Sequence, residues 1–179
     1  MTINESKAYA YAQWCIQNNN QYIGKYVKKQ AKAWLDIADG KSNVAYIDES
    51  MFIKICNILK LMVHPDLRVS IYQGLEDYAW LLIVAVFCTK SKSDNSRYYE
   101  TALLEIARKN FKTFNSGVIF IVGMLIEPKF SRFFSVAPDL ALSSELKLAI
   151  RKIIKSSPAL LKHFKIQVKL IICKLTEIE

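Results

Sequence analysis

The sequence has few of the features that mark flexible or membrane-spanning chains. Among its 179 residues are only five glycines and four prolines, and no Gly- or Ser-rich stretch marks a linker, so one compact body with a helical N-terminal extension is expected. The two longest apolar runs, residues 78–88 and 117–126, have 11 and 10 residues. Because a membrane-spanning helix needs about 20, both runs are predicted to be helices buried against a sheet.

Paired cysteines and a signal peptide are also missing. Cys15, Cys56, Cys88 and Cys173 lie in apolar surroundings and form no C-x-x-C pair. This pattern is typical of reduced, buried thiols rather than of disulfides or a zinc site. The first residues, MTINESKAYAYAQ, have neither the basic nor the apolar region of a signal peptide. These absences predict a cytosolic protein.

Acidic residues are absent between Leu146 and Thr176, where eight basic residues occur. The whole chain has 25 Lys and Arg against 16 Asp and Glu, a net charge of +9. An excess of this size suits contact with phosphate-rich partners or anionic surfaces. One function that it allows is nucleic-acid binding through the basic face at residues 147–174.

The apolar periodicity predicts both helices and strands. Helical spacing predicts helices over residues 6–17, 21–38, 48–62, 74–88, 112–127 and 143–155. Runs rich in β-branched and aromatic residues predict strands over residues 98–106, 131–138 and 165–175. From Tyr98 the order is strand, loop, helix, strand, helix, strand, which is typical of a parallel α/β sheet. The predicted division is an N-terminal helical region, residues 1–68, and an α/β core, residues 69–179.

The loop between the first predicted strand and its helix has the last two residues of a phosphate-binding loop. In the motif G-x-x-x-x-G-K-[ST], backbone N–H groups surround the phosphates, the Lys reaches the β- and γ-phosphates, and the hydroxyl ligates Mg²⁺. Lys112 and Thr113 occupy the last two positions, and Arg108 and Lys109 add positive charge. The sequence therefore predicts a site for ATP and Mg²⁺ within a partial P-loop NTPase-like parallel sheet with flanking helices.

The segment RYYETALLEIARKNFKT, residues 97–113, resembles the start of the ATPase of tailed-phage terminase large subunits, the motors that package viral DNA. Their variant P-loop reads like RKNGKS, which places Arg108, Lys109 and Asn110 inside the loop. The segment IYQGLEDYAWLLIVAVF, residues 71–87, is similar to the family's upstream segment, where an aromatic–Gln pair holds adenine. The resemblance places Tyr72 and Gln73 at the base.

The resemblance continues through FFSVAPD and IIKSSPALLKHFKI, residues 133–139 and 153–166, and so covers most of the chain. It implies ATP and Mg²⁺ as cofactors and the cytoplasm of a host bacterium as the compartment. The partners that it implies are double-stranded phage DNA, the terminase small subunit and the portal, with no membrane.

Two features depart from the family pattern. Phe111 replaces the glycine before the Lys, and a non-Gly residue is disfavoured at positive φ. The sequence also ends at Glu179 without a segment of four apolar residues followed by Asp-Glu, the pair that would hold magnesium and activate water. The expectation is a shortened front part of a terminase motor, of prophage origin or an excised fragment, which binds nucleotide weakly and does not hydrolyse it by itself.

Two other interpretations remain open. The loop can be a solvated basic turn that binds nothing. The chain can instead be a non-catalytic interaction protein of phage or prophage origin, which docks on a terminase, a portal or another protein through an exposed sheet edge. His64 and His163 have no Cys or carboxylate partner at catalytic or ligand spacing, so both are predicted to be structural.

Overall fold

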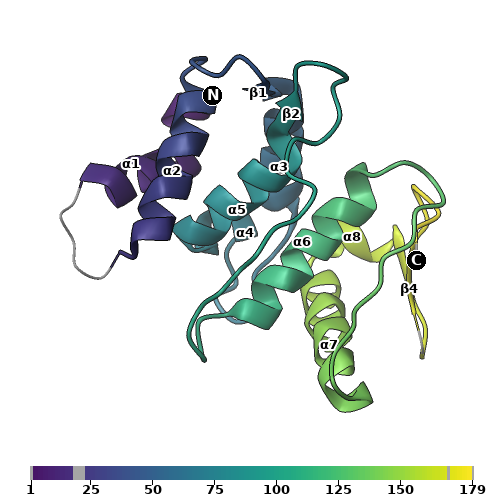
Figure 1. Cartoon of the computed structure of the whole chain (residues 1–179). Helices are drawn as coiled ribbons and strands as arrows, with labels where there is room; N and C mark the ends of the chain where they lie inside the picture. The colour runs from purple at the N-terminus through teal and green to yellow at the C-terminus, as the bar shows by residue number, and fades with distance from the viewer. Residues whose placement is uncertain (1, 18–22, 169, 179) are drawn as a thin grey trace. The chain divides into compact units, whose positions relative to one another are not determined.

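The computed structural model describes residues 2–17, 23–168 and 170–178 (Figure 1). The chain divides into two compact units, each built from two stretches of sequence. Unit 1 comprises Met1–Lys54 and Glu76–Leu104, and unit 2 comprises Ile55–Leu75 and Glu105–Glu179. Helix α3, Glu49–Leu61, contributes residues to both. The boundary near residue 68 stays a prediction.

Unit 1 is a small helical bundle with one short two-stranded sheet. Its helices are the 3₁₀ turn η1 and α1, α2 and α5, with bounds Ile3–Glu5, Lys7–Gln17, Lys25–Ala38 and Asp77–Cys88. Helix α1 packs against α2 and α5 through small buried residues, including Ala8 and Ala12. Trp34 and Trp80 fill the core at 1% exposure each. Such large apolar side chains supply most of the burial free energy.

The sheet of unit 1 is antiparallel. Strands β1, Ala45–Ile47, and β2, Thr89–Ser91, pair with Tyr46 opposite Lys90. The strand predicted at residues 98–106 does not pair with this sheet. An isolated bridge joins Lys90 to Arg97, and residues 99–107 have no regular strand structure.

Unit 2 centres on the packed pair α6 and α7. Its elements are α4, α6, α7, α8, β3 and β4, with bounds Ile71–Gly74, Lys112–Ile126, Leu140–Ser156, Pro158–Leu161, Phe164–Ile166 and Ile171–Cys173. Gly117 lets the two long helices approach closely, because a Cβ added there would lie 3.3 Å from Ile153 Cδ1 and 3.5 Å from the Ala149 Cβ. Strands β3 and β4 form an antiparallel pair.

A buried serine joins the two stretches of sequence in unit 2. The Ser157 hydroxyl donates to the Ile153 carbonyl at 2.7 Å and accepts from the Val63 N–H at 2.8 Å. Ser157 is fully buried, so both bonds are formed away from water. They hold the end of α7 against the segment that leads into α4.

The predicted α/β fold with a P-loop-like parallel sheet is wrong. The described residues are mostly helical, and their strands form two small antiparallel two-stranded sheets with no parallel sheet. The predicted strand at residues 131–138 has no ladder, and the one at residues 165–175 is instead part of the hairpin β3–β4. A β-rich composition favours an extended backbone, but a sheet also needs neighbouring strands to pair with.

The predicted helices are confirmed, with ends shifted by a few residues, as α1, α2, α3, α5, α6 and α7. The break predicted at Asn18, Asn19 and Asn20 lies outside the described residues. All four cysteines are free and buried, as predicted. Within the described ranges, none of the helices combines the length and apolar character needed to cross a membrane.

Candidate phosphate-binding loop

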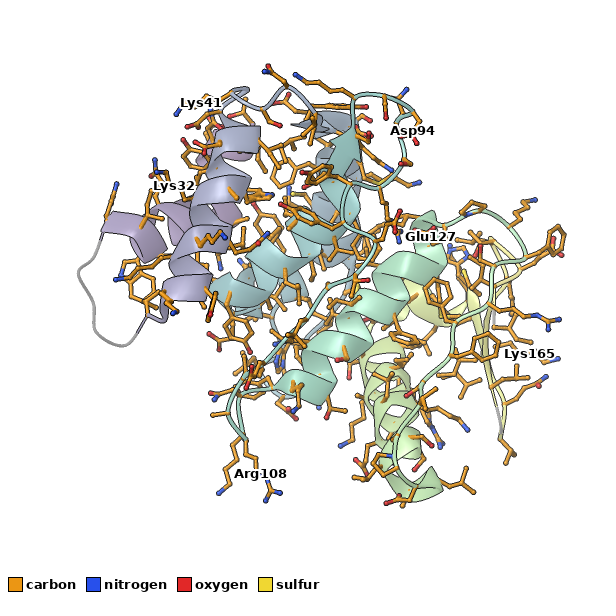
Figure 2. The ribbon with its side chains drawn as sticks, in the orientation of Figure 1. Lys32, Lys41, Asp94, Arg108, Glu127 and Lys165 are labelled. Carbon is orange, nitrogen blue, oxygen red and sulfur yellow. The ribbon has the colours of Figure 1, made fainter. Side chains whose placement is uncertain are left out.

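The candidate loop is the connection that enters α6. Residues 108–110 form a turn, and α6 begins at Lys112, where the helix was predicted. Arg108, Lys109, Asn110, Lys112 and Thr113 are all exposed. Figure 2 shows the Arg108 side chain pointing away from the loop into solvent. The sequence-predicted phosphate ligands therefore lie together on one accessible turn at a helix start.

The backbone of the turn alternates in the sign of φ. Lys109 and Phe111 have positive φ values of 67° and 54°, whereas Asn110 between them does not. Alternation between left- and right-handed conformations turns successive N–H groups toward one side, and such a concave row binds anions. With a ψ of 23°, Phe111 adopts the left-handed conformation, which glycine reaches more readily than other residues. This conformation is disfavoured for a residue with a Cβ, so Phe111 carries backbone strain.

The first turn of α6 has open N–H groups. Phe111 is the N-cap and offers no side-chain acceptor, unlike Asp139, whose carboxylate accepts from the Leu142 N–H at the start of α7. The N–H groups of the first helical turn have no partner within a helix. In the described part of the chain, no acceptor is recorded for those of residues 112–114. Together with the helix dipole they favour an anion at this end.

The cations of the loop are available to a ligand. Among the described residues, none of Arg108, Lys109 and Lys112 forms a salt bridge. The surrounding unit is also basic, since unit 2 has fifteen Lys and Arg against seven Asp and Glu, a net charge of +8 out of the chain's +9. Charge and open N–H groups both favour a polyanion such as a triphosphate.

Tyr72 and Gln73, the predicted adenine ligands, lie on the short helix α4 of the same unit. The Lys60 ammonium lies over the Tyr72 ring at 5.0 Å from its centroid, and the Ser70 hydroxyl bonds Gln73 Oε1 at 3.2 Å. Tyr72 is half-buried and Gln73 is exposed. A base that stacks on this face of Tyr72 has to displace the Lys60 side chain.

His64 links α4 to the start of α6. Its ring centroid lies 4.4 Å from that of Phe114, the residue after Thr113. A Cβ added at Gly74, the last residue of α4, would lie 3.6 Å from His64 Cδ2. His64 thus lies near both Gly74, which ends α4, and Phe114 in the first turn of α6. Sequence reasoning gave His64 a structural role and missed this link, for which the sequence alone has no signal.

The hydrogen bonds of His64 require its neutral form. Nδ1 accepts from the N–H groups of Asp66 and Leu67, both at 3.2 Å, so the ring proton is on Nε2. Burial lowers the pKa of His64, and the nearby Asp66 charge opposes this shift in part. Protonation of Nδ1 would place a donor against two donors and break the turn that leads to α4.

Lowering the pH from about 7.5 to 5.5 is expected to destabilise unit 2 through His64. The unfolded histidine takes up a proton near pH 6.5, whereas the folded one does so at lower pH. The stabilisation is therefore complete above about pH 6.5 and is lost as the pH falls through the folded pKa. Urea unfolding of the wild type and of His64→Gln at both pH values measures this change in the free energy of unfolding.

The His64→Gln variant should lose this pH dependence, although it is less stable at both pH values. His163→Gln is the matched control, because it removes the other histidine and should retain the wild-type slope. Equal slopes in the wild type and His64→Gln would contradict the assignment.

Metal ligands are sparse at the loop. The described residues contain no group of three or more His, Cys, Asp or Glu side chains that could hold a metal ion. The exposed hydroxyl of Thr113 is the oxygen that the motif would offer to Mg²⁺, with phosphate oxygens and water completing the coordination.

Comparison with family models, with curated proteins and with solved structures found no match. The likeness to terminases accordingly rests on the residues of the loop and of its neighbouring segments.

Proposed function

We propose that the chain binds the phosphates of ATP at residues 108–113, as the N-terminal ATPase part of a phage terminase large subunit. The observation that carries the proposal is the alternation of φ at Lys109, Asn110 and Phe111, directly before an uncapped helix start. That backbone presents N–H groups to an anion without help from a sheet. The proposal therefore does not depend on a parallel sheet, which the described residues do not form.

Each loop residue has a defined role in this proposal. The N–H groups of the turn and of the first turn of α6 hold the phosphate oxygens. Lys112 contacts the β- and γ-phosphates, Arg108 and Lys109 add charge at the rim, and Thr113 orients Mg²⁺. Tyr72 and Gln73 lie in the same unit and contact the base after Lys60 moves from the Tyr72 ring. Bound Mg²⁺ neutralises part of the phosphate charge.

In this proposal the chain binds ATP but does not hydrolyse it. Phosphoryl transfer to water depends on a group that positions the attacking water. Downstream of the loop, the given sequence has no segment of four apolar residues followed by Asp-Glu. The proposed partners remain double-stranded DNA, the small subunit and the portal, in the cytoplasm of a host bacterium.

Replacing Lys112 with alanine is expected to weaken Mg-ATP binding severalfold. Lys112 is exposed, so the variant should fold normally and lose one charge-assisted contact to phosphate. Isothermal titration calorimetry of both proteins measures the change. Lys165→Ala is the matched control, because Lys165 is an exposed lysine of the same unit on β3. If both substitutions weakened Mg-ATP binding equally, the loss would reflect net charge alone, and the assignment of the site to the loop would be refuted.

A further inference from the structure

Residues 132–137, termed here the edge segment, belong to the connection between α6 and α7 and form no helix or strand (Figure 1). Their side chains are buried to different extents. Phe133 and Ala137 are half-buried, and the Phe133 ring lies 5.6 Å from that of Phe120 on α6. Phe134 and Val136 are 77% and 92% exposed. Phe133 is thus packed on α6, whereas the next three residues are exposed and place two large apolar side chains, Phe134 and Val136, in solvent.

The backbone of the edge segment lacks a partner strand. Within the described part of the chain, no hydrogen bond is recorded for the N–H or C=O groups of residues 133–137. The segment begins beside the end of the hairpin, because the Phe130 N–H donates to the Thr176 carbonyl at 3.1 Å. An exposed run of unpaired backbone groups with apolar side chains is a template for another strand.

The charge around the edge segment selects the kind of strand. Lys129 and Arg132 lie at its start, and Lys165 projects from the neighbouring hairpin (Figure 2). Since unit 2 has a net charge of +8, a second copy of the chain would bring like charges together. A strand in which carboxylates alternate with apolar residues complements both the positive charge of unit 2 and the exposed apolar side chains of the edge segment.

We propose that the edge segment is a docking strand for an acidic, alternately apolar segment of another protein, which adds to it by backbone hydrogen bonds. Phe134 and Val136 contact the apolar residues of the incoming strand, and Lys129 and Arg132 lie near its carboxylates. This interaction is separate from nucleotide binding, since the loop at residues 108–113 contributes nothing to it.

The test uses a short labelled peptide in which Val alternates with Glu, and a matched peptide in which Val alternates with Lys. Fluorescence anisotropy with the full chain should show binding of the Glu peptide and not of the Lys peptide. The double variant Phe134→Asn/Val136→Asn should bind the Glu peptide at least about tenfold more weakly. Val168→Asn is the control, because Val168 is 90% exposed in the same unit but outside the edge segment.

Hydrogen exchange separates strand addition from simple charge attraction. The Glu peptide should protect amides within residues 133–137, since these form the new ladder. Equal binding of both peptides, or binding without protection of these amides, would overturn the proposal. Sedimentation that shows the chain pairing with itself through this segment would also overturn it, since a second copy would then be the occupant.

Discussion

Replacing Phe111 with glycine is expected to tighten Mg-ATP binding by about tenfold. Phe111 has a φ of 54°, and the left-handed region costs a residue with a Cβ about 1–2 kcal/mol. In the unbound loop the strained Phe111 is free to leave this conformation, and an anion held by the N–H groups must keep it there, so binding carries that strain. Glycine adopts it freely, and about 1.4 kcal/mol corresponds to a tenfold change in affinity. Calorimetric titration with Mg-ATP measures the difference.

The alanine variant separates the two ways in which Phe111 can hinder binding. Phe111→Ala keeps the Cβ and its strain but removes the ring. If backbone strain is the obstacle, Phe111→Ala should bind like the wild type and Phe111→Gly should bind more tightly. If both variants bind Mg-ATP more tightly by the same factor, the ring is the obstacle. Unchanged or weaker binding in a folded Phe111→Gly protein would contradict the proposed loop geometry.

The stability of Phe111→Gly should change by less than about 1 kcal/mol, which keeps the binding experiment interpretable. Relief of strain stabilises the variant, whereas the greater backbone freedom of glycine in the unfolded chain costs about 0.5–1 kcal/mol. The Phe111 ring is 52% exposed, so little packing is lost. These terms largely offset one another.

The helices were predictable because their information is local. In α7, Ile150, Ile153 and Ile154 recur at helical spacing and are all buried, and Asp139 caps the first turn. A three-residue spacing and a capping carboxylate act within one element, whatever the rest of the chain does. The same holds for α6, whose start at Lys112 was predicted from the loop.

The sheet was not predictable because pairing is not local. Residues 98–106 have the composition of a buried strand, yet Leu103 is 86% exposed. Composition cannot tell a paired strand from an extended segment without neighbours, since both place alternate side chains on opposite sides. The hairpin β3–β4 formed where its two strands lie within one short stretch of sequence.

The candidate site was predictable in part for the same reason. The residues of the loop are consecutive, so the sequence identified them directly. The contact between His64 and Phe114 joins residues fifty positions apart, so it depends on the tertiary packing of unit 2. The positive φ at Phe111 was not predictable either, because an aromatic residue does not favour it.

Replacing Gly117 with leucine is expected to destabilise unit 2 by about 3 kcal/mol or more. A Cβ at this position would already lie 3.3 Å from Ile153 Cδ1 and 3.5 Å from the Ile150 backbone nitrogen. The longer side chain must force α6 and α7 apart, because Ile150 and Ile153 are buried and cannot move into solvent. Overpacking of this kind costs about 1–3 kcal/mol and occasionally more. Urea unfolding measures the loss.

Two further variants show that the close approach of the helices is the cause. Gly117→Ala should be nearly neutral, because the higher helix propensity of alanine, about 1 kcal/mol, offsets the crowding of a single methyl group against Ile153. Lys152→Leu adds the same side chain to the exposed face of α7 and should change stability by less than about 0.5 kcal/mol. If Gly117→Leu were as stable as Lys152→Leu, α6 and α7 would not pack at the distance that Gly117 permits.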